Sequence, residues 1–168
     1  MRTRAQRVYR VLGLMLLLAA PCSLLLLPVD VVLVGAQSGP ILFVEHISKG
    51  DNVVLSHTNS MYMERVEEAL AFDGSDLTLA DVKTDSYGVK EYYRITDGLP
   101  RRSWRNVTFM NSASGQFQVT IKGKAVEDLS RFADQPITFG ITRCPLAYYL
   151  SWRLFGIFPI SSLSQQPS

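Results

Sequence analysis

Hydrophobic and polar residues alternate with a period of two along much of the second half of the chain. Residues 117–122 show this pattern, and residues 137–142 repeat it. Such alternation is typical of strands with one buried face, because successive side chains point to opposite sides. Short turn signals separate roughly seven such segments. The pattern predicts a mainly β domain, either a small antiparallel β-sandwich or a partly open barrel.

Turn residues indicate how these segments connect. The dipeptide Asp73-Gly74 suits a tight hairpin between residues 69–72 and 76–82. Residues 112–115 similarly connect residues 106–110 with the strand that contains Phe117.

Two segments carry helix-forming residues. Residues 64–71 are rich in them, and their apolar spacing also fits a helix, but the adjacent hairpin signal favours a strand. Residues 127–133 are the better candidate, because Leu129 and Phe132 lie three positions apart among polar residues. We therefore expect one short helix.

The N-terminal segment has the pattern of a membrane anchor. Residues 11–29 carry no charge and would reach roughly 28 Å as a helix, close to the thickness of a bilayer core. Four arginines precede this run and place the N-terminus in the cytoplasm by the positive-inside rule: Arg2, Arg4, Arg7 and Arg10. We expect a transmembrane helix within residues 1–36, retained rather than cleaved at the small residues 34–36. The main domain, residues 37–143, would then lie in a bacterial periplasm, tethered to the inner membrane.

Composition excludes several classes of function. The formal net charge of +2 includes the four N-terminal arginines, so the exported part has no basic field for nucleic acid. The two cysteines, Cys22 and Cys144, give neither a plausible intrachain disulfide nor the spacing of metal ligands. We expect no cofactor, no metal and a single domain of about 130 residues after the anchor.

The C-terminal segment, residues 144–168, is apolar and aromatic but contains a charge. Three interpretations remain open for it: contact with the membrane interface, spanning or docking against another membrane protein, and ordinary core packing. A central arginine is costly in a spanning helix, whereas it can extend to the headgroups from an interfacial one. The candidate membrane-contact residues are Tyr148, Tyr149, Trp152, Arg153 and Phe155.

Candidate catalytic chemistry is sparse. His57 could act as a general base, although a histidine in a strand is more often a rim or satisfied core residue. No nucleophile-elbow sequence accompanies it. We therefore expect no enzymatic activity, with a hydrolase that uses His57 as the remaining alternative.

Polar residues suggest a binding region instead. If residues 66–72 form a strand, Glu68 lies in an apolar row and needs a donor such as His57, Asn59 or Arg65, unless it sits at an exposed edge. Ser60 fits a turn. Residues 85–88 fit either a binding loop or an ordinary turn. The candidate binding residues are His57, Asn59, Ser60, Glu68, Ser86, Tyr87 and Gly88.

Three of these stretches, residues 54–61, 66–68 and 85–88, also carry a resemblance. They resemble, in order and spacing, the motifs of the small exported family catalogued as domain of unknown function 1850. The resemblance extends over roughly residues 41–142. Three departures are visible: Asn59 stands where the family has a histidine, Arg65 replaces a proline, and Val89-Lys90 replaces alanine-glycine.

The resemblance implies a periplasmic accessory of tripartite ATP-independent periplasmic (TRAP) transporters of the TAXI type, in a family without an established reaction. The partner implied by the resemblance is the solute-binding protein or the membrane subunit of such a transporter. Asparagine can hydrogen-bond to Glu68 but cannot transfer protons near neutral pH, which favours a structural polar pair. The first hypothesis is thus an interaction module that uses a sheet edge or the Tyr87-Gly88 loop. The alternative is a module that binds a small ligand or contacts lipid.

Overall fold

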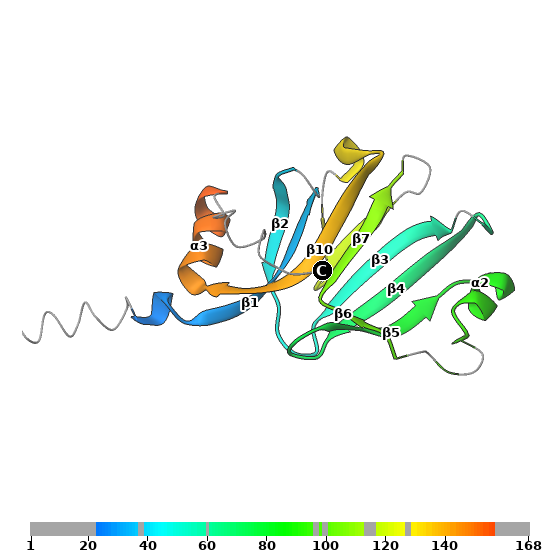
Figure 1. Cartoon of the computed structure of the whole chain (residues 1–168), viewed down its shortest axis with the longest axis horizontal. Coiled ribbons are helices and arrows are strands. Elements are labelled where there is room, and N and C mark those ends of the chain that lie inside the picture. Colours follow the sequence, from blue (N-terminus) through cyan, green and yellow to red (C-terminus); the bar gives the residue numbers. More distant parts are fainter. Residues whose placement is uncertain are drawn as a thin grey trace, which may run out of the picture. The chain divides into compact units, whose positions relative to one another are not determined.

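The computed structural model describes residues 23–36, 39–59, 61–95, 98, 101–112, 117–126 and 129–156. The chain divides into two compact units. One unit consists of residues 30–142, and the other combines residues 1–29 with residues 143–168. The elements with defined bounds are ten strands, the short helices α2 and α3 and the 3-10 turn η2, so the described part of the chain is mainly β (Figure 1).

The larger sheet has six strands in the order β6-β5-β4-β3-β8-β9, and every neighbouring pair is antiparallel. Its strands are β3 (Asn52–Asn59), β4 (Glu64–Phe72), β5 (Leu77–Lys83), β6 (Ser103–Trp104), β8 (Gln118–Ile121) and β9 (Lys124–Ala125). The predicted hairpin joins β4 to β5. Gly74 has a φ of +111°, and the Asp73 carboxylate accepts from the N–H groups of Ser75 and Asp76. A glycine is suited to this turn because positive φ costs it little.

The smaller sheet has four strands in the order β2-β1-β10-β7. They are β1 (Pro28–Ala36), β2 (Ile41–His46), β7 (Asn106–Asn111) and β10 (Gln135–Pro145). The pairs β1–β2 and β7–β10 are antiparallel. The 3-10 turn η2 (Leu129–Phe132) precedes β10, and the Asn111 side chain donates to the carbonyls of Leu129 and Phe132.

One hydrophobic core contains residues from both sheets. Val53, Val66 and Ile121 of the larger sheet and Ile137 and Phe139 of the smaller one are fully buried within it. The buried residues alternate along β8 and along residues 135–139 of β10, as the period-two pattern predicted, whereas residues 139–141 of β10 are buried consecutively. Two antiparallel sheets with a shared core are consistent with a β-sandwich.

Several expectations differ from the structure. Residues 30–36 were placed with the N-terminal segment, but they form most of β1, in which Val31 to Val34 are buried. The continuous apolar run of this strand resembles a membrane segment because both of its faces are covered. The predicted link between β7 and β8 joins strands of different sheets rather than a hairpin. The helix expected at residues 127–133 is the shorter η2, whose flanking residues 127 and 128 lie outside the described ranges.

The segment with mixed helix and strand signals is strand β4. Its register with β3 runs from Asn52 opposite Ala71 to Asn59 opposite Glu64. Tertiary pairing therefore outweighs the local helix propensity, because β4 is hydrogen-bonded on both sides. The predicted N-terminal transmembrane helix falls mostly on residues 1–22, which lie outside the described residues. Among the helices that are described, none is long and apolar enough to cross a membrane.

Candidate functional site

The β3–β4 pairing brings His57 and Glu68 to the same face of the larger sheet. Leu55 lies opposite Glu68, and His57 lies opposite Val66. Because side chains alternate along a strand, His57 and Glu68 are diagonal neighbours on the inner face. The predicted apolar row with one carboxylate is thus present, with Val66 and Leu70 buried on either side of Glu68.

Glu68 has two partners in this cluster. The hydroxyl of Tyr93 donates to Glu68 Oε1 at 2.5 Å, and Nε2 of His57 lies 4.0 Å from the same oxygen. Tyr93 follows helix α2 (Tyr87–Tyr92) as its C-terminal cap. We refer to His57, Glu68 and Tyr93 as the polar cluster.

Aromatic packing holds the histidine. Its ring stacks on Phe117 at a centroid distance of 5.2 Å, and Phe117 stacks on Phe109 of the smaller sheet at 4.6 Å. The Nδ1 atom of His57 is buried without a hydrogen-bond partner among the described residues. The imidazole therefore lies in a mainly apolar environment with one charged neighbour.

Burial controls the protonation of this cluster. It lowers the pKa of His57, and the nearby Glu68 carboxylate opposes that shift in part. Burial raises the pKa of Tyr93, and the hydrogen bond to Glu68 raises it further. At neutral pH the histidine is thus mainly neutral and the tyrosine is a hydrogen-bond donor. The cluster positions α2 on the sheet, since Tyr93 terminates that helix and Glu68 lies in the middle of β4.

Asn59 and Arg65, the other donors expected for Glu68, have different roles. The Oδ1 atom of Asn59 accepts from the N–H groups of Met61 and Tyr62 at 3.0 and 3.1 Å, which shapes the β3–β4 turn. Arg65 points to the opposite face, where it lies 3.4 Å from Glu67. Ser60 lies outside the described residues. The expected Asn59–Glu68 pair is thus replaced by a turn contact and a tyrosine bond.

The Ser86, Tyr87 and Gly88 stretch begins helix α2. Ser86 is the N-cap, and its Oγ accepts from the N–H of Val89 at 3.4 Å. A Cβ on Gly88 would lie 2.4 Å from the ring of Tyr62, so the glycine is needed for close packing. The stretch is therefore the capped start of a helix.

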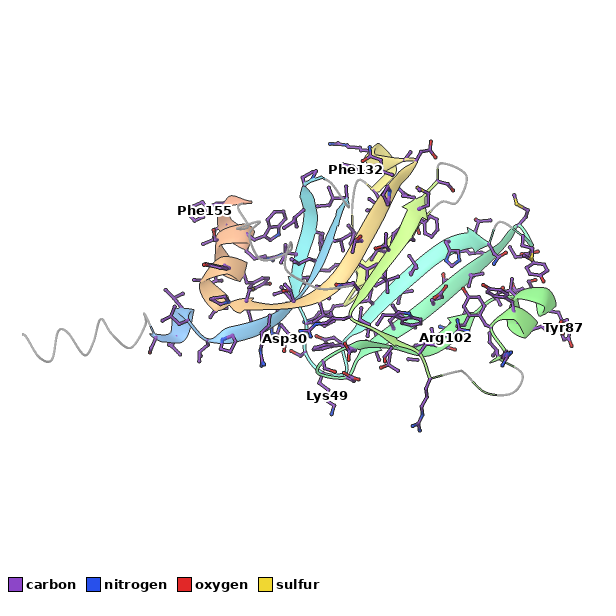
Figure 2. All side chains as sticks on the ribbon, viewed as in Figure 1. Asp30, Lys49, Tyr87, Arg102, Phe132 and Phe155 are labelled. Carbon is purple, nitrogen blue, oxygen red and sulfur yellow. The ribbon has the colours of Figure 1, made fainter. Side chains whose placement is uncertain are left out.

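The β3–β4 turn and α2 together expose large apolar side chains. We define the tyrosine–methionine surface as Met61, Tyr62, Met63, Tyr87 and Tyr92. Met61, Met63 and Tyr87 expose 73%, 72% and 72% of their areas. The Tyr62–Gly88 contact joins the two segments, and Tyr92 lies one helical turn beyond Gly88 on the same side of α2. Figure 2 shows Tyr87 projecting outward from the helix.

Charged residues flank this surface. A shallow cleft of about 180 Å³ is lined by Arg65, Glu67, Lys83, Thr84 and Asp85. Arg65 follows Met63 by two positions, and Asp85 directly precedes the N-cap of α2. An apolar centre with a polar rim is the usual composition of a protein interface.

The candidate membrane-contact residues lie on helix α3 (Leu146–Phe155), in the unit formed by the two ends of the chain. None of the helix residues is buried, and Leu154 and Phe155 are largely exposed. The N–H of Leu146 donates to the carbonyl of Leu27 at 2.9 Å. Tyr148, Tyr149, Trp152 and Arg153 share this helix, whose first residue is thus bonded to the last part of the N-terminal apolar run.

Comparison of the chain with protein-family models, with curated proteins and with solved structures finds no match. Within the described ranges, no group of three or more histidine, cysteine, aspartate or glutamate side chains is arranged to hold a metal ion.

Sequence reasoning missed Tyr93, Tyr62 and Val89. A usable signal existed for two of them, because Val89 and Tyr93 are an apolar and an aromatic residue four positions apart, which is the spacing of one helix face. The contact between Tyr62 and Gly88 had no local signal, since it depends on how the turn and the helix pack.

Proposed function

We propose that this chain is a membrane-anchored periplasmic accessory module that associates with a TAXI-type TRAP transporter through its tyrosine–methionine surface. The observation that carries the proposal is the concentration of five exposed large apolar side chains on two adjoining segments. The transporter is chosen because residues 54–61, 66–68 and 85–88 resemble the motifs of a family with that setting. The anchor is proposed from the arginine-flanked apolar run.

The chemistry of this surface supports a protein partner. Tyrosine is enriched among residues that dominate binding energy, because it buries a large area and keeps a polar tip. Methionine adapts its shape to irregular partner surfaces. Exposed apolar side chains gathered in one place also indicate an interaction site more strongly than scattered ones.

The underlying contacts prepare this surface for binding. Val89 is fully buried, Tyr93 is bonded to Glu68, and Ser86 caps the first turn of α2. These contacts fix the helix against the sheet, so binding needs less ordering of the backbone. A β-sandwich is the architecture that we propose for the exported domain, because two sheets share one core.

Direct binding of the full-length, detergent-extracted protein to the transporter's solute-binding protein and membrane subunit tests the proposal. We expect a dissociation constant of about 10 µM or tighter for one of them. The double variant Met61→Ser/Met63→Ser should weaken binding at least about tenfold, because it removes exposed apolar contacts. Met110→Ser is the matched control, since Met110 is 57% exposed on β7 of the smaller sheet.

Absence of association with either subunit at about 100 µM would contradict the transporter assignment. If the Met110 control weakens association as much as the double variant does, binding does not occur through the tyrosine–methionine surface. Circular dichroism of each variant establishes that the fold is retained.

A second candidate function is lipid contact by α3. It is favoured by the absence of buried residues in this helix and by its hydrogen bond to Leu27. Amphipathic aromatic side chains suit the headgroup level, and Arg153 can extend into water from there. The lipid partner would be the bilayer that holds the anchor.

Tryptophan fluorescence tests this candidate in vesicles that contain the full chain. Trp104→Phe leaves Trp152 as the single tryptophan, and Trp152→Phe leaves Trp104 on β6 as the control. Lipids brominated near the headgroup should quench Trp152 and leave Trp104 unchanged. Equal quenching, or none at Trp152, would reject lipid contact.

A further inference from the structure

A groove of about 810 Å³ runs between strands of the two sheets. Pro40 and residues 41–43 of β2 line it, together with Lys124 and Ala125 of β9. Arg131 and Phe132 of η2 complete it, and Figure 2 labels Phe132 on that turn. This volume is in the range of natural binding sites.

Both strands of the groove are edge strands. In the part of the chain that the structure describes, β2 pairs only with β1, and β9 pairs only with β8. The edge of a sheet presents backbone N–H and C=O groups that can pair with another strand. The groove therefore lies beside two strands that each have a sheet neighbour on one side only in the described part of the chain.

The lining pattern shows that the groove follows an edge rather than a strand face. A face contributes every second residue, because side chains alternate. Here four consecutive residues, 40–43, line the groove, and Ile41, Leu42 and Phe43 are all half-buried without alternation. The backbone of β2 thus borders the groove.

The first half of this edge lacks the usual protection. Ile41, Leu42 and Phe43 are uncharged, whereas exposed edges commonly carry lysine or another charge. The second half is covered, because Lys124 Nζ lies 3.1 Å from Glu45 and Lys122 Nζ donates to the His46 carbonyl at 3.4 Å. The open part of β2 is therefore limited to the segment that lines the groove.

The charged side chains that line the groove favour an acidic partner. Both charged residues in its lining, Lys124 and Arg131, are basic. A lysine ammonium has three donors, so the contact with Glu45 leaves capacity for a second carboxylate. The apolar walls and the positive charges together fit an extended chain that alternates apolar and acidic side chains.

We propose that this groove binds an extended acidic segment of another polypeptide, which adds as a strand to β2 and places carboxylates beside Lys124 and Arg131. The site shares no residue with the tyrosine–methionine surface, and the inference does not depend on a transporter partner. A fatty-acid carboxylate would match the charges and the apolar walls but would not use the row of backbone groups along the edge.

Fluorescence polarisation with defined peptides tests this inference on the full-length protein in a mild non-ionic detergent. The probe is a labelled hexapeptide of alternating valine and glutamate, long enough to pair with the open residues 41–43 of β2 and to reach Lys124 and Arg131. We expect it to bind, and we expect the version with lysine in place of glutamate not to bind. Raising the salt concentration should weaken binding, because exposed charge pairs are screened.

Two N-methylated forms of the probe identify strand addition. Each carries methyl groups on alternate backbone nitrogens, in one of the two possible sets. Only one set points to β2 in a paired strand, so one form should lose binding and the other should keep it. Equal binding of both forms would overturn the proposal.

Variants of the protein provide a second readout. Lys124→Gln and Arg131→Gln should each weaken peptide binding about fivefold, and Lys49→Gln on a distant turn should leave it unchanged. Binding of dodecanoate that depends on both residues, without binding of the acidic peptide, would assign the groove to an acyl carboxylate and overturn the proposal. If the protein forms a dimer that dissociates in Arg131→Gln, the groove binds a second copy of this chain, and the proposal of an acidic segment from another polypeptide is overturned.

Discussion

The hydroxyl of Tyr93 donates a hydrogen bond to the carboxylate of Glu68, and this bond joins the end of α2 to the middle of β4. The two residues are 25 positions apart in the chain. The bond satisfies a carboxylate that lies between the buried Val66 and Leu70. It also holds the helix that carries Tyr87 and Tyr92, so the polar cluster supports the proposed interaction surface.

Removal of the Tyr93 hydroxyl should destabilise the protein. We expect Tyr93→Phe to lower the free energy of unfolding by about 1.5 kcal/mol, because Glu68 loses its closest donor in a largely buried position. Chemical denaturation measures this change. Glu68→Gln should cost less, since an amide oxygen still accepts from Tyr93. Equal stability of Tyr93→Phe and the wild type would contradict a supporting role for the bond.

The stability of the protein should depend on His57 at mildly acidic pH. Burial lowers its pKa in the folded state below the ordinary 6.5, so the unfolded chain binds a proton first as the pH falls. The wild type should therefore lose stability relative to His57→Phe as the pH falls from about 7.5 to 5. Above this window, the stability difference between the two proteins should no longer change with pH. Phenylalanine preserves the stack on Phe117.

Denaturation of both proteins across this pH range tests the prediction, and His46 is common to the two chains. A stability difference that stays constant with pH, or that favours the wild type in acid, would show that the Glu68 carboxylate raises the pKa of His57 at least as much as burial lowers it.

Alkaline pH should act through Tyr93. Its pKa is raised above the ordinary 10.0 by burial and by Glu68, so the unfolded chain loses this proton at lower pH than the folded one. Folding stability should fall as the pH rises above about 10, and Tyr93→Phe should lack this contribution. Absorbance of tyrosinate during a pH titration measures the delayed ionisation. Full ionisation of every tyrosine near pH 10 in the folded protein would contradict the buried hydrogen bond.

Gly88 should resist substitution although it lies in a helix. Alanine normally stabilises a helix by about 1 kcal/mol relative to glycine. Here the added Cβ would lie 2.4 Å from the Tyr62 ring, so we expect Gly88→Ala to destabilise the protein and to displace the β3–β4 turn. Tyr62→Ala should remove the clash, and the double variant should then be more stable than the sum of the single changes predicts. Strict additivity of the two changes would contradict the contact.

The alternating patterns predicted strands correctly in several places. The strands of residues 118–121 and 135–145, the hairpin at Gly74 and the face shared by Val66, Glu68 and Leu70 follow from local sequence, because side-chain alternation and turn geometry are local properties. A partner for Glu68 was also predictable in principle, since a carboxylate in an apolar row must be satisfied.

The identity of that partner required the tertiary structure. Tyr93 reaches Glu68 only because α2 folds back on the sheet, and no local pattern encodes this distance. The same reason explains why Asn59 shapes its own turn instead of pairing with Glu68. It also explains the division between sheets, in which β7 and β8 are consecutive in the chain but belong to different layers.

The sequence by itself determined the β class, the apolar N-terminal run with its flanking arginines, and the presence of a carboxylate on an apolar strand face. The tertiary structure decided that residues 30–36 belong to a buried strand, that Tyr62 and Gly88 join two exposed segments, and that β2 and β9 border a groove. Periodicity reports which face of an element is buried, but long-range packing decides which elements meet.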